Sequence, residues 1–135
     1  MTDARSWLGR ARSIEKEIDA LFQSKQETRD RLTRITQNYN SDGAQVSKDP
    51  HKYDKLVELE DLLDRKTDEL IDVKQEITEA IALLNDGRQR TVLLDYYIRG
   101  MSLEETAVHM GYSYANIKKI RAKAITAIAE KCSLK

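Results

Sequence analysis

The sequence has few of the residues that build sheets, disulfide frameworks and membrane spans. Its 135 residues include one proline, five glycines and one cysteine, and 6% are aromatic. Aromatic and β-branched runs with a period of two are missing, which excludes a sheet protein. The lone Cys132 excludes an internal disulfide, and with only two separated histidines it argues against a metal site. The N-terminal residues lack an apolar run long enough for a signal peptide or a membrane span. We therefore expect an all-α, cytoplasmic protein that uses no cofactor and contacts no membrane.

The net charge is zero, but charge is unevenly distributed along the chain. Residues 50–85 carry 5 basic and 10 acidic side chains, whereas residues 86–135 carry 9 basic and 5 acidic ones. From Ser113 onward the sequence has 6 basic side chains, and Glu130 is the only acidic one. Positive charge therefore collects on the last predicted helix, where a surface for phosphate groups would be expected.

Two heptad seams predict long helices in the first two thirds of the chain. The first seam covers residues 7–39 and is broken only by Lys25; the second covers residues 56–84 and is broken only by Lys66. Residues 38–50 between them are rich in Asn, Ser, Asp and Gly and predict a loop. Folding back of one helix on the other places the two lysines level, so we expect each to reach the edge of the seam or an acidic neighbour.

These seams predict an antiparallel coiled-coil hairpin over residues 1–85. Four residues beside the seam make the apolar face wider than one partner helix covers: Phe22, Leu62, Ile71 and Ile81. A long seam with excess apolar width favours self-association, and we expect a homodimer formed through the hairpin. The alternative is that the hairpin is simply the core of the protein.

Signals for helix ends become frequent in the last third of the chain. Asp86 has the residue type and position of an N-cap for a helix over residues 88–99, which would stop at Gly100. Ser102 and Glu105 have the spacing of a capping box and predict the start of a short second helix.

Gly111 predicts a turn between that short helix and a third one. A helix end that must take a positive φ is most readily occupied by glycine, and Ser113 can cap the helix that follows. Ala107 is small where two crossing helices must approach closely. The other residues at the spacing that packs such a corner are Thr106, Met110, Tyr112, Ile117 and Ile120. We therefore expect a helix-turn-helix DNA-binding domain over residues 86–135.

The third helix separates into two faces at about 100° per residue. Its inward face is predicted to hold Ile117, Ile120, Ala124 and Ile128. Alanines between lysines on the other face would let the helix lie close in the major groove of double-stranded DNA, its lysines reaching phosphates or base acceptors. The predicted DNA-binding residues are Tyr114, Ala115, Asn116, Lys118, Lys119, Arg121 (on the shoulder of the face), Ala122 and Lys123. The alternative is that this basic face is only solvated.

The stretch "GRQRTVLLDYYIRGMSLEETAVHMGYSYANIKKIRAKAITAIAE", residues 87–130, resembles region four of bacterial sigma-70-type factors, a promoter-binding module. The whole chain is similar to small phage and prophage proteins of Gram-positive bacteria, related to the ArpU-like and RinA-like regulators of late phage genes. The resemblance implies a phage transcription regulator acting in the bacterial cytoplasm.

The likeness to region four covers the scaffold but not the residues that read bases. Region four tends to have arginine and glutamate where this chain has Tyr114 and Ala115, and arginine and glutamine where it has Lys118 and Lys119. The usual sigma-factor promoter element is therefore not the expected target. Because the other sigma regions are missing, the resemblance implies a protein that assists or redirects the host RNA polymerase.

Other classes of function stay open at this point. One alternative is a small-terminase-like DNA-packaging component, in which a helix-turn-helix and a coiled coil also coexist. Another is a protein-binding adaptor, in which the corner binds polymerase or another protein and does not contact DNA. Catalysis is not expected, because the four carboxylates that suggest a cluster have the spacing of a solvated helix side. They are Asp61, Asp64, Asp68 and Asp72. We expect His51 in a loop or at a helix start, and His109 at an exposed helix position.

Overall fold

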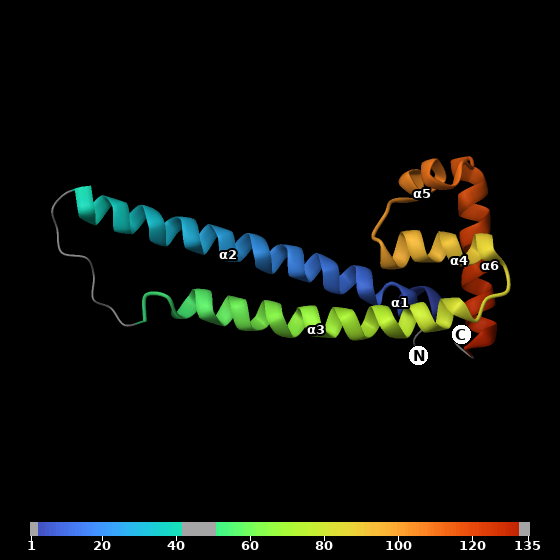
Figure 1. Ribbon diagram of the computed structural model, residues 1–135, viewed down its shortest axis with the longest axis horizontal. Helices are drawn as coiled ribbons and strands as arrows, with labels where there is room; N and C mark the ends of the chain where they lie inside the picture. The colour runs from blue at the N-terminus through green and yellow to red at the C-terminus, as the bar shows by residue number, and fades with distance from the viewer. Residues whose placement is uncertain (1–2, 42–50, 133–135) are drawn as a thin grey trace. The chain divides into compact units, whose positions relative to one another are not determined.

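The computed structural model describes the backbone of residues 3–41 and 51–132, and their side chains except those of residues 36–41. These residues form helices and connecting turns, with no strand among them, which confirms the all-α prediction (Figure 1). The helices are α1 (Ala4–Leu8), α2 (Arg10–Ser41), α3 (Asp54–Ala82), α4 (Gly87–Leu93), the π-helical segment η1 (Leu94–Ile98), α5 (Leu103–Met110) and α6 (Tyr114–Lys131). None of the helices within the described ranges is long and apolar enough to cross a membrane. Helix α2 extends into the loop predicted at residues 38–50, and the rest of that loop lies outside the described residues.

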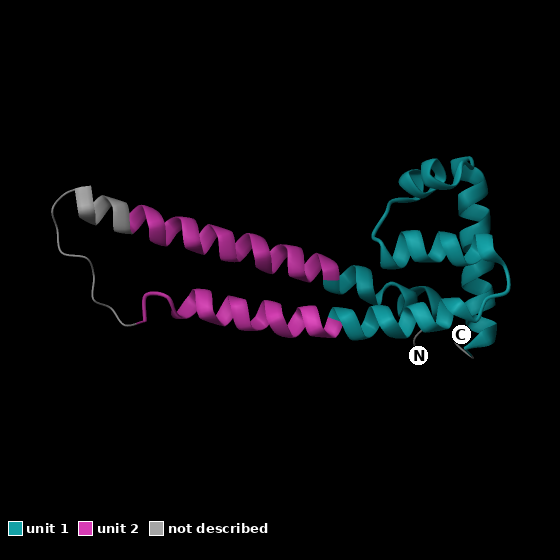
Figure 2. Ribbon diagram, in the orientation of Figure 1, with its two compact units in different colours: residues 1–14, 70–135 teal, residues 15–69 magenta. Residues whose placement is uncertain are grey.

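Contacts divide the chain into two compact units (Figure 2). Unit 1 contains residues 1–14 and 70–135, and unit 2 contains residues 15–69. The start of α2 and the end of α3 therefore belong to the same compact unit as the C-terminal helices. The division into functional domains at residues 1–85 and 86–135 stays a prediction.

Within unit 2, ion pairs join the α2 and α3 segments. Lys66 Nζ lies 3.0 Å from Glu17 and 3.4 Å from Glu69, and Lys25 Nζ lies 3.5 Å from Glu60. The order of these pairs along the two helices shows that the segments run in opposite directions. A hydrogen bond to Glu17 and the charge of that carboxylate raise the pKa of Lys66. The two lysines that interrupt the seams thus pair with acidic neighbours, as predicted.

Unit 2 buries little of its apolar surface. Leu59 is its only buried hydrophobic residue among those described, while Phe22 and Val57 are about half exposed, at 47% and 53%. Leu21 and Leu63, on the predicted seams, are only partly buried. Two helices alone leave this stripe incompletely covered, as expected for a narrow two-helix contact.

Unit 1 has two hydrophobic clusters around α6. The larger one combines side chains from α1, the start of α2, the end of α3, α4, η1 and the C-terminal half of α6: Ala4, Leu8, Ala11, Ile77, Ala80, Ile81, Leu84, Leu93, Tyr97, Ala124 and Ile128. The smaller one joins α4, α5 and the first half of α6 through Val92, Ala107, Ile117 and Ile120. The predicted inward face of α6 is therefore confirmed, and both halves of α6 are held by buried contacts.

One predicted helix is divided in the structure. The helix expected over residues 88–99 begins at Gly87 as α4, widens into the π-helical η1 after Leu93, and ends before Gly100, whose φ is 72°. The π-helical turn has i→i+5 hydrogen bonds but covers only five residues, too few for sequence periodicity to distinguish it from a continuous α-helix. Asp86 is the N-cap, as predicted: its side chain accepts a hydrogen bond from the Arg88 backbone N–H at 2.9 Å.

Candidate nucleic-acid interface

The turn between α5 and α6 has the geometry that its sequence predicts. Gly111 has φ 72° and ψ 30°, the left-handed conformation in which a Cβ is strained. Its N–H donates to the carbonyl of Val108 at 3.3 Å, and the N–H of Tyr112 donates to the carbonyl of Ala107 at 3.0 Å. This pair of bonds is the Schellman arrangement, which ends α5 sharply and satisfies two of its last carbonyls.

Both helices at this corner begin with side-chain caps. At the start of α5 the Glu105 N–H donates to Ser102 Oγ at 3.0 Å, and the Ser102 N–H donates to Glu105 Oε1 at 3.1 Å. At the start of α6 the Asn116 N–H donates to Ser113 Oγ at 3.1 Å. The predicted capping box and the predicted cap at Ser113 are confirmed. These bonds fix where α6 begins, and hence which residues occupy its first turns.

Most of the predicted DNA-binding residues lie on one exposed side of α6. The exposed ones are Tyr114, Ala115, Asn116, Lys118, Lys119, Ala122 and Lys123. Lys118 Nζ lies 5.3 Å from the ring centre of Tyr114, within the range of a cation–π contact. We call this group of seven residues the lysine face. It combines three positive charges, two small alanines and an aromatic ring that is 43% exposed.

Arg121 does not belong to the lysine face, although its position on the helix predicted it there. Its guanidinium carbon lies 4.8 Å from the ring centre of Tyr96 and 5.6 Å from that of Tyr97, and its Nη2 donates to Tyr97 Oη at 2.9 Å. The side chain is half-buried. A long side chain on the shoulder of a helix can turn either way, and here the two tyrosines turn it inward.

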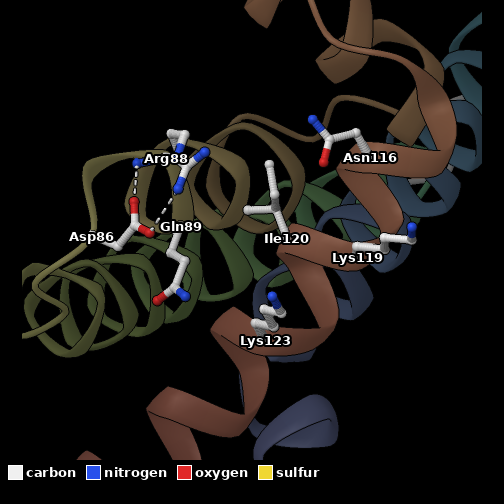
Figure 3. A pocket seen from close by; sticks show the side chains of 7 residues that line it. All are labelled: Asp86, Arg88, Gln89, Asn116, Lys119, Ile120 and Lys123. Atoms are coloured by element: carbon white, nitrogen blue, oxygen red, sulfur yellow. Dashed lines mark hydrogen bonds and ion pairs between the residues drawn. The ribbon is translucent and has the colours of Figure 1, made fainter.

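A groove beside the lysine face brings in residues that the sequence reasoning missed. Figure 3 shows the side chains of Asn116, Lys119 and Lys123 on α6 and those of Arg88 and Gln89 on the first turn of α4. The groove has a volume of about 310 Å³, and Asp86 and Ile120 complete its lining. Three cationic side chains around a space of this size suit an anion such as a phosphate group. The basic run "GRQR" at a helix start was the signal that could have found Arg88.

Asp86 is the acidic residue of this groove, and its charge is already engaged. Besides accepting from the Arg88 backbone, it lies 3.5 Å from Arg88 Nη2. The backbone N–H of Arg88 lowers the pKa of Asp86, so the carboxylate stays charged at neutral pH as part of the cap of α4. The carboxylate in the lining of the groove thus has its own partners on α4.

A buried carboxylate ties α5 to η1. Asp95 is 2% exposed; its Oδ2 lies 2.6 Å from His109 Nδ1, and its Oδ1 accepts from Arg99 Nη1 at 3.0 Å. His109 lies at an exposed position of α5, as expected, but its ring also pairs with Asp95, a contact that the sequence did not predict. Asp95 and His109 are 14 residues apart, and no local spacing rule connects them.

Within residues 3–41 and 51–132, no group of three or more His, Cys, Asp or Glu side chains could hold a metal ion. What the lysine face and the groove can do chemically is bind anions, through lysine and arginine side chains held on rigid helices.

Comparison with known proteins assigns the chain to a protein family. No curated protein and no solved structure matches the chain. A family model matches residues 33–129, a stretch that includes most of unit 2 and nearly all of α6. The chain belongs to this family, which is described as "Protein of unknown function (DUF1492)".

Proposed function

We propose that this protein is a DNA-binding transcription regulator in which α5, the Gly111 turn and α6 form a helix-turn-helix. The lysine face of α6 enters the major groove, and the groove at Arg88 receives a backbone phosphate. The observation that carries the proposal is the division of α6 into a fully buried side, with Ile117 and Ile128 at 0% exposure, and an exposed side with three lysines. A helix held this firmly presents its charges in one fixed direction, which suits a regular array of phosphates.

Each part of the lysine face has a role in this proposal. Lys119 and Lys123 border the groove and reach the DNA backbone, while Tyr114 and Asn116, at the start of α6, point toward base edges. The small Ala115 and Ala122 let the helix approach closely, and an alanine can contact a thymine methyl group. Since the residues at these positions differ from those of sigma region four, the target sequence is expected to differ as well.

The α2 and α3 segments of unit 2 are proposed to form the antiparallel hairpin that joins two copies of the chain. Support comes from their opposed directions and from the partly exposed apolar stripe around Leu59. A second hairpin would cover that stripe and bring two lysine faces into one dimer. The two copies of α6 in such a dimer would bind two half-sites on one DNA duplex.

A contact with the host RNA polymerase is the second part of the proposal. The outer side of α5 has a shallow apolar hollow lined by Met101, Val108 and His109, with Glu104 and Glu105 at its border. Val108 is 84% exposed and adds its side chain to the apolar lining of this hollow. This surface supports a protein contact made while α6 holds DNA. It also favours, as a second candidate, an adaptor that binds polymerase alone.

The experiment that tests DNA binding is a salt titration of affinity for a mixed-sequence duplex, read by fluorescence anisotropy. We expect the logarithm of the binding constant to fall linearly with the logarithm of salt concentration, by about 0.9 per phosphate contact. Lys118→Ala with Lys119→Ala should reduce binding severely and lower the slope by up to about 2. A matched double variant, Lys16→Ala with Lys55→Ala, removes the same charge from exposed positions in unit 2 and should leave the slope unchanged.

Two outcomes would overturn the proposal in different ways. Absence of binding to any duplex at low salt would leave the adaptor as the better reading. A ring of eight or more subunits in light scattering would instead favour a DNA-packaging component over a dimeric regulator.

A further inference from the structure

Two guanidinium groups stack on the ring of Tyr96 in unit 1. The Arg12 Cζ lies 4.2 Å from the ring centre, and the Arg121 Cζ lies 4.8 Å from it. Arg12 comes from the first turns of α2, Tyr96 from η1 and Arg121 from the middle of α6. Three segments far apart in the sequence thus meet on one aromatic ring.

Arg12 also bonds the backbone at this point. Its Nη1 donates to the Tyr96 carbonyl at 2.7 Å and lies 3.4 Å from the carbonyl of Met101. The first of these carbonyls is in the π-helical turn, and the second directly precedes Ser102, the cap of α5. Arg12 therefore connects the start of α2 to both ends of the segment that leads from η1 into α5.

Arg121 extends the same connection to α6. Its Nη2 donates to Tyr97 Oη, and the Tyr97 ring meets the Tyr96 ring edge-to-face at 4.8 Å. Tyr97 is 2% exposed, in the larger hydrophobic cluster. The Arg121 side chain leaves α6 between its inward face and the lysine face. Its contacts with Tyr96 and Tyr97 at this position resist rotation of the helix about its own axis.

We propose that Arg12, Tyr96 and Arg121 are positioning residues, which set the rotation of α6 so that the lysine face meets DNA, while Arg121 itself touches no phosphate. This inference rests on the proposed DNA-binding function. A cationic side chain engaged with two aromatic rings must give up these contacts to reach a phosphate, which makes Arg121 a poor DNA ligand. Holding the reading helix in its bound orientation before DNA arrives lowers the ordering cost of binding.

The salt dependence of binding separates positioning from contact. Arg121→Gln and Arg12→Gln should each weaken duplex binding by roughly tenfold, the size of a partly desolvated cation–π contact. Because no phosphate contact is lost, the salt slope of either variant should equal that of the wild type, unlike the slope of Lys118→Ala, which falls by about 0.9. Arg34→Gln, the same charge change at an exposed position of α2 in unit 2, should leave both quantities unchanged.

Two further variants test the connection through Tyr96. Tyr96→Phe keeps the ring and should bind as the wild type does, whereas Tyr96→Leu should weaken binding as Arg12→Gln does. The double variant Arg12→Gln with Arg121→Gln should lose less than the product of the two single losses, because both arginines act on one ring. Urea unfolding of each variant identifies conditions in which all are folded, so that lower affinity does not reflect unfolded protein.

Hydrogen exchange in the free protein tests the same inference without DNA. Arg12→Gln should speed amide exchange in α6, at a distance from the substitution, while exchange in unit 2 stays as in the wild type. A salt slope lowered by about 0.9 in Arg121→Gln would overturn the inference by making Arg121 a phosphate ligand. Unchanged affinity and unchanged exchange in Arg12→Gln would overturn it as well. If the wild type bound no duplex, the proposed function would fail, and the exchange experiment would still decide whether Arg12 orders α6.

Discussion

Replacing Gly111 by alanine tests the turn on which the proposed interface depends. No heavy atom outside its immediate neighbours lies within 4 Å of the position that a Cβ would take, so steric contact adds nothing to the cost. The cost is therefore that of holding a non-glycine residue at φ 72°, about 1–2 kcal/mol. Alanine also restricts the unfolded chain, which offsets about 0.4–1 kcal/mol of this. We expect Gly111→Ala to lower the free energy of unfolding by about 1 kcal/mol.

Urea unfolding followed by circular dichroism measures this change, with Gly87→Ala as the control. Gly87 lies in the first turn of α4 and has no positive φ; a Cβ there would meet only the end of the Arg90 side chain, at 3.4 Å. Gly87→Ala should therefore stabilise the protein by about 0.5–1 kcal/mol. Gly111→Asn should cost less than Gly111→Ala, because asparagine tolerates the left-handed region better. A Gly111→Ala protein as stable as the wild type would refute the assigned turn.

Three further predictions concern the residues that support α6. Ile117→Ala removes a side chain with 0% exposure and should cost about 2–5 kcal/mol in urea unfolding; a loss below about 1 kcal/mol would mean that Ile117 does not pack in this cluster. Asp95→Ala should cost about 1–3 kcal/mol, since it removes a buried acceptor shared by His109 and Arg99, and His109→Ala in the Asp95→Ala background should then cost little more. The pKa of Asp86 is lowered by the Arg88 N–H, so its contribution to stability is complete above about pH 5 and is lost as the pH falls through the unfolded-state and then the lower, folded-state pKa. Wild-type stability should thus decline more steeply than that of Asp86→Asn between about pH 5 and pH 3, and equal slopes would contradict the cap.

The features predicted correctly from the sequence are local ones. The caps at Asp86, Ser102 and Ser113 and the turn at Gly111 each depend on residues within four positions of each other, and all four are present. The inward face of α6 was equally predictable, because a period of 3.6 residues places its apolar side chains in one line.

The features that the sequence did not predict depend on distant partners. Arg12 bonds a carbonyl 84 residues away, and His109 pairs with a carboxylate that no local pattern connects to it. The position of Arg121 around the helix axis predicts it on the DNA-binding side. That position fixes only the direction of its Cβ. The two tyrosines that turn the side chain inward come from another segment, so no helical pattern within α6 predicts their effect. The start of α2 and the C-terminal helices belong to one compact unit because of such long-range contacts.

The most direct measurement of the central claim is an NMR titration of the isotope-labelled protein with a mixed-sequence duplex at low salt. If α6 binds DNA through the lysine face, the largest amide shift changes occur between Tyr114 and Lys123 and at Arg88, and they reverse when salt is added. Shift changes confined to α3 or to the outer side of α5 would contradict it, as would a spectrum that stays unchanged at saturating duplex.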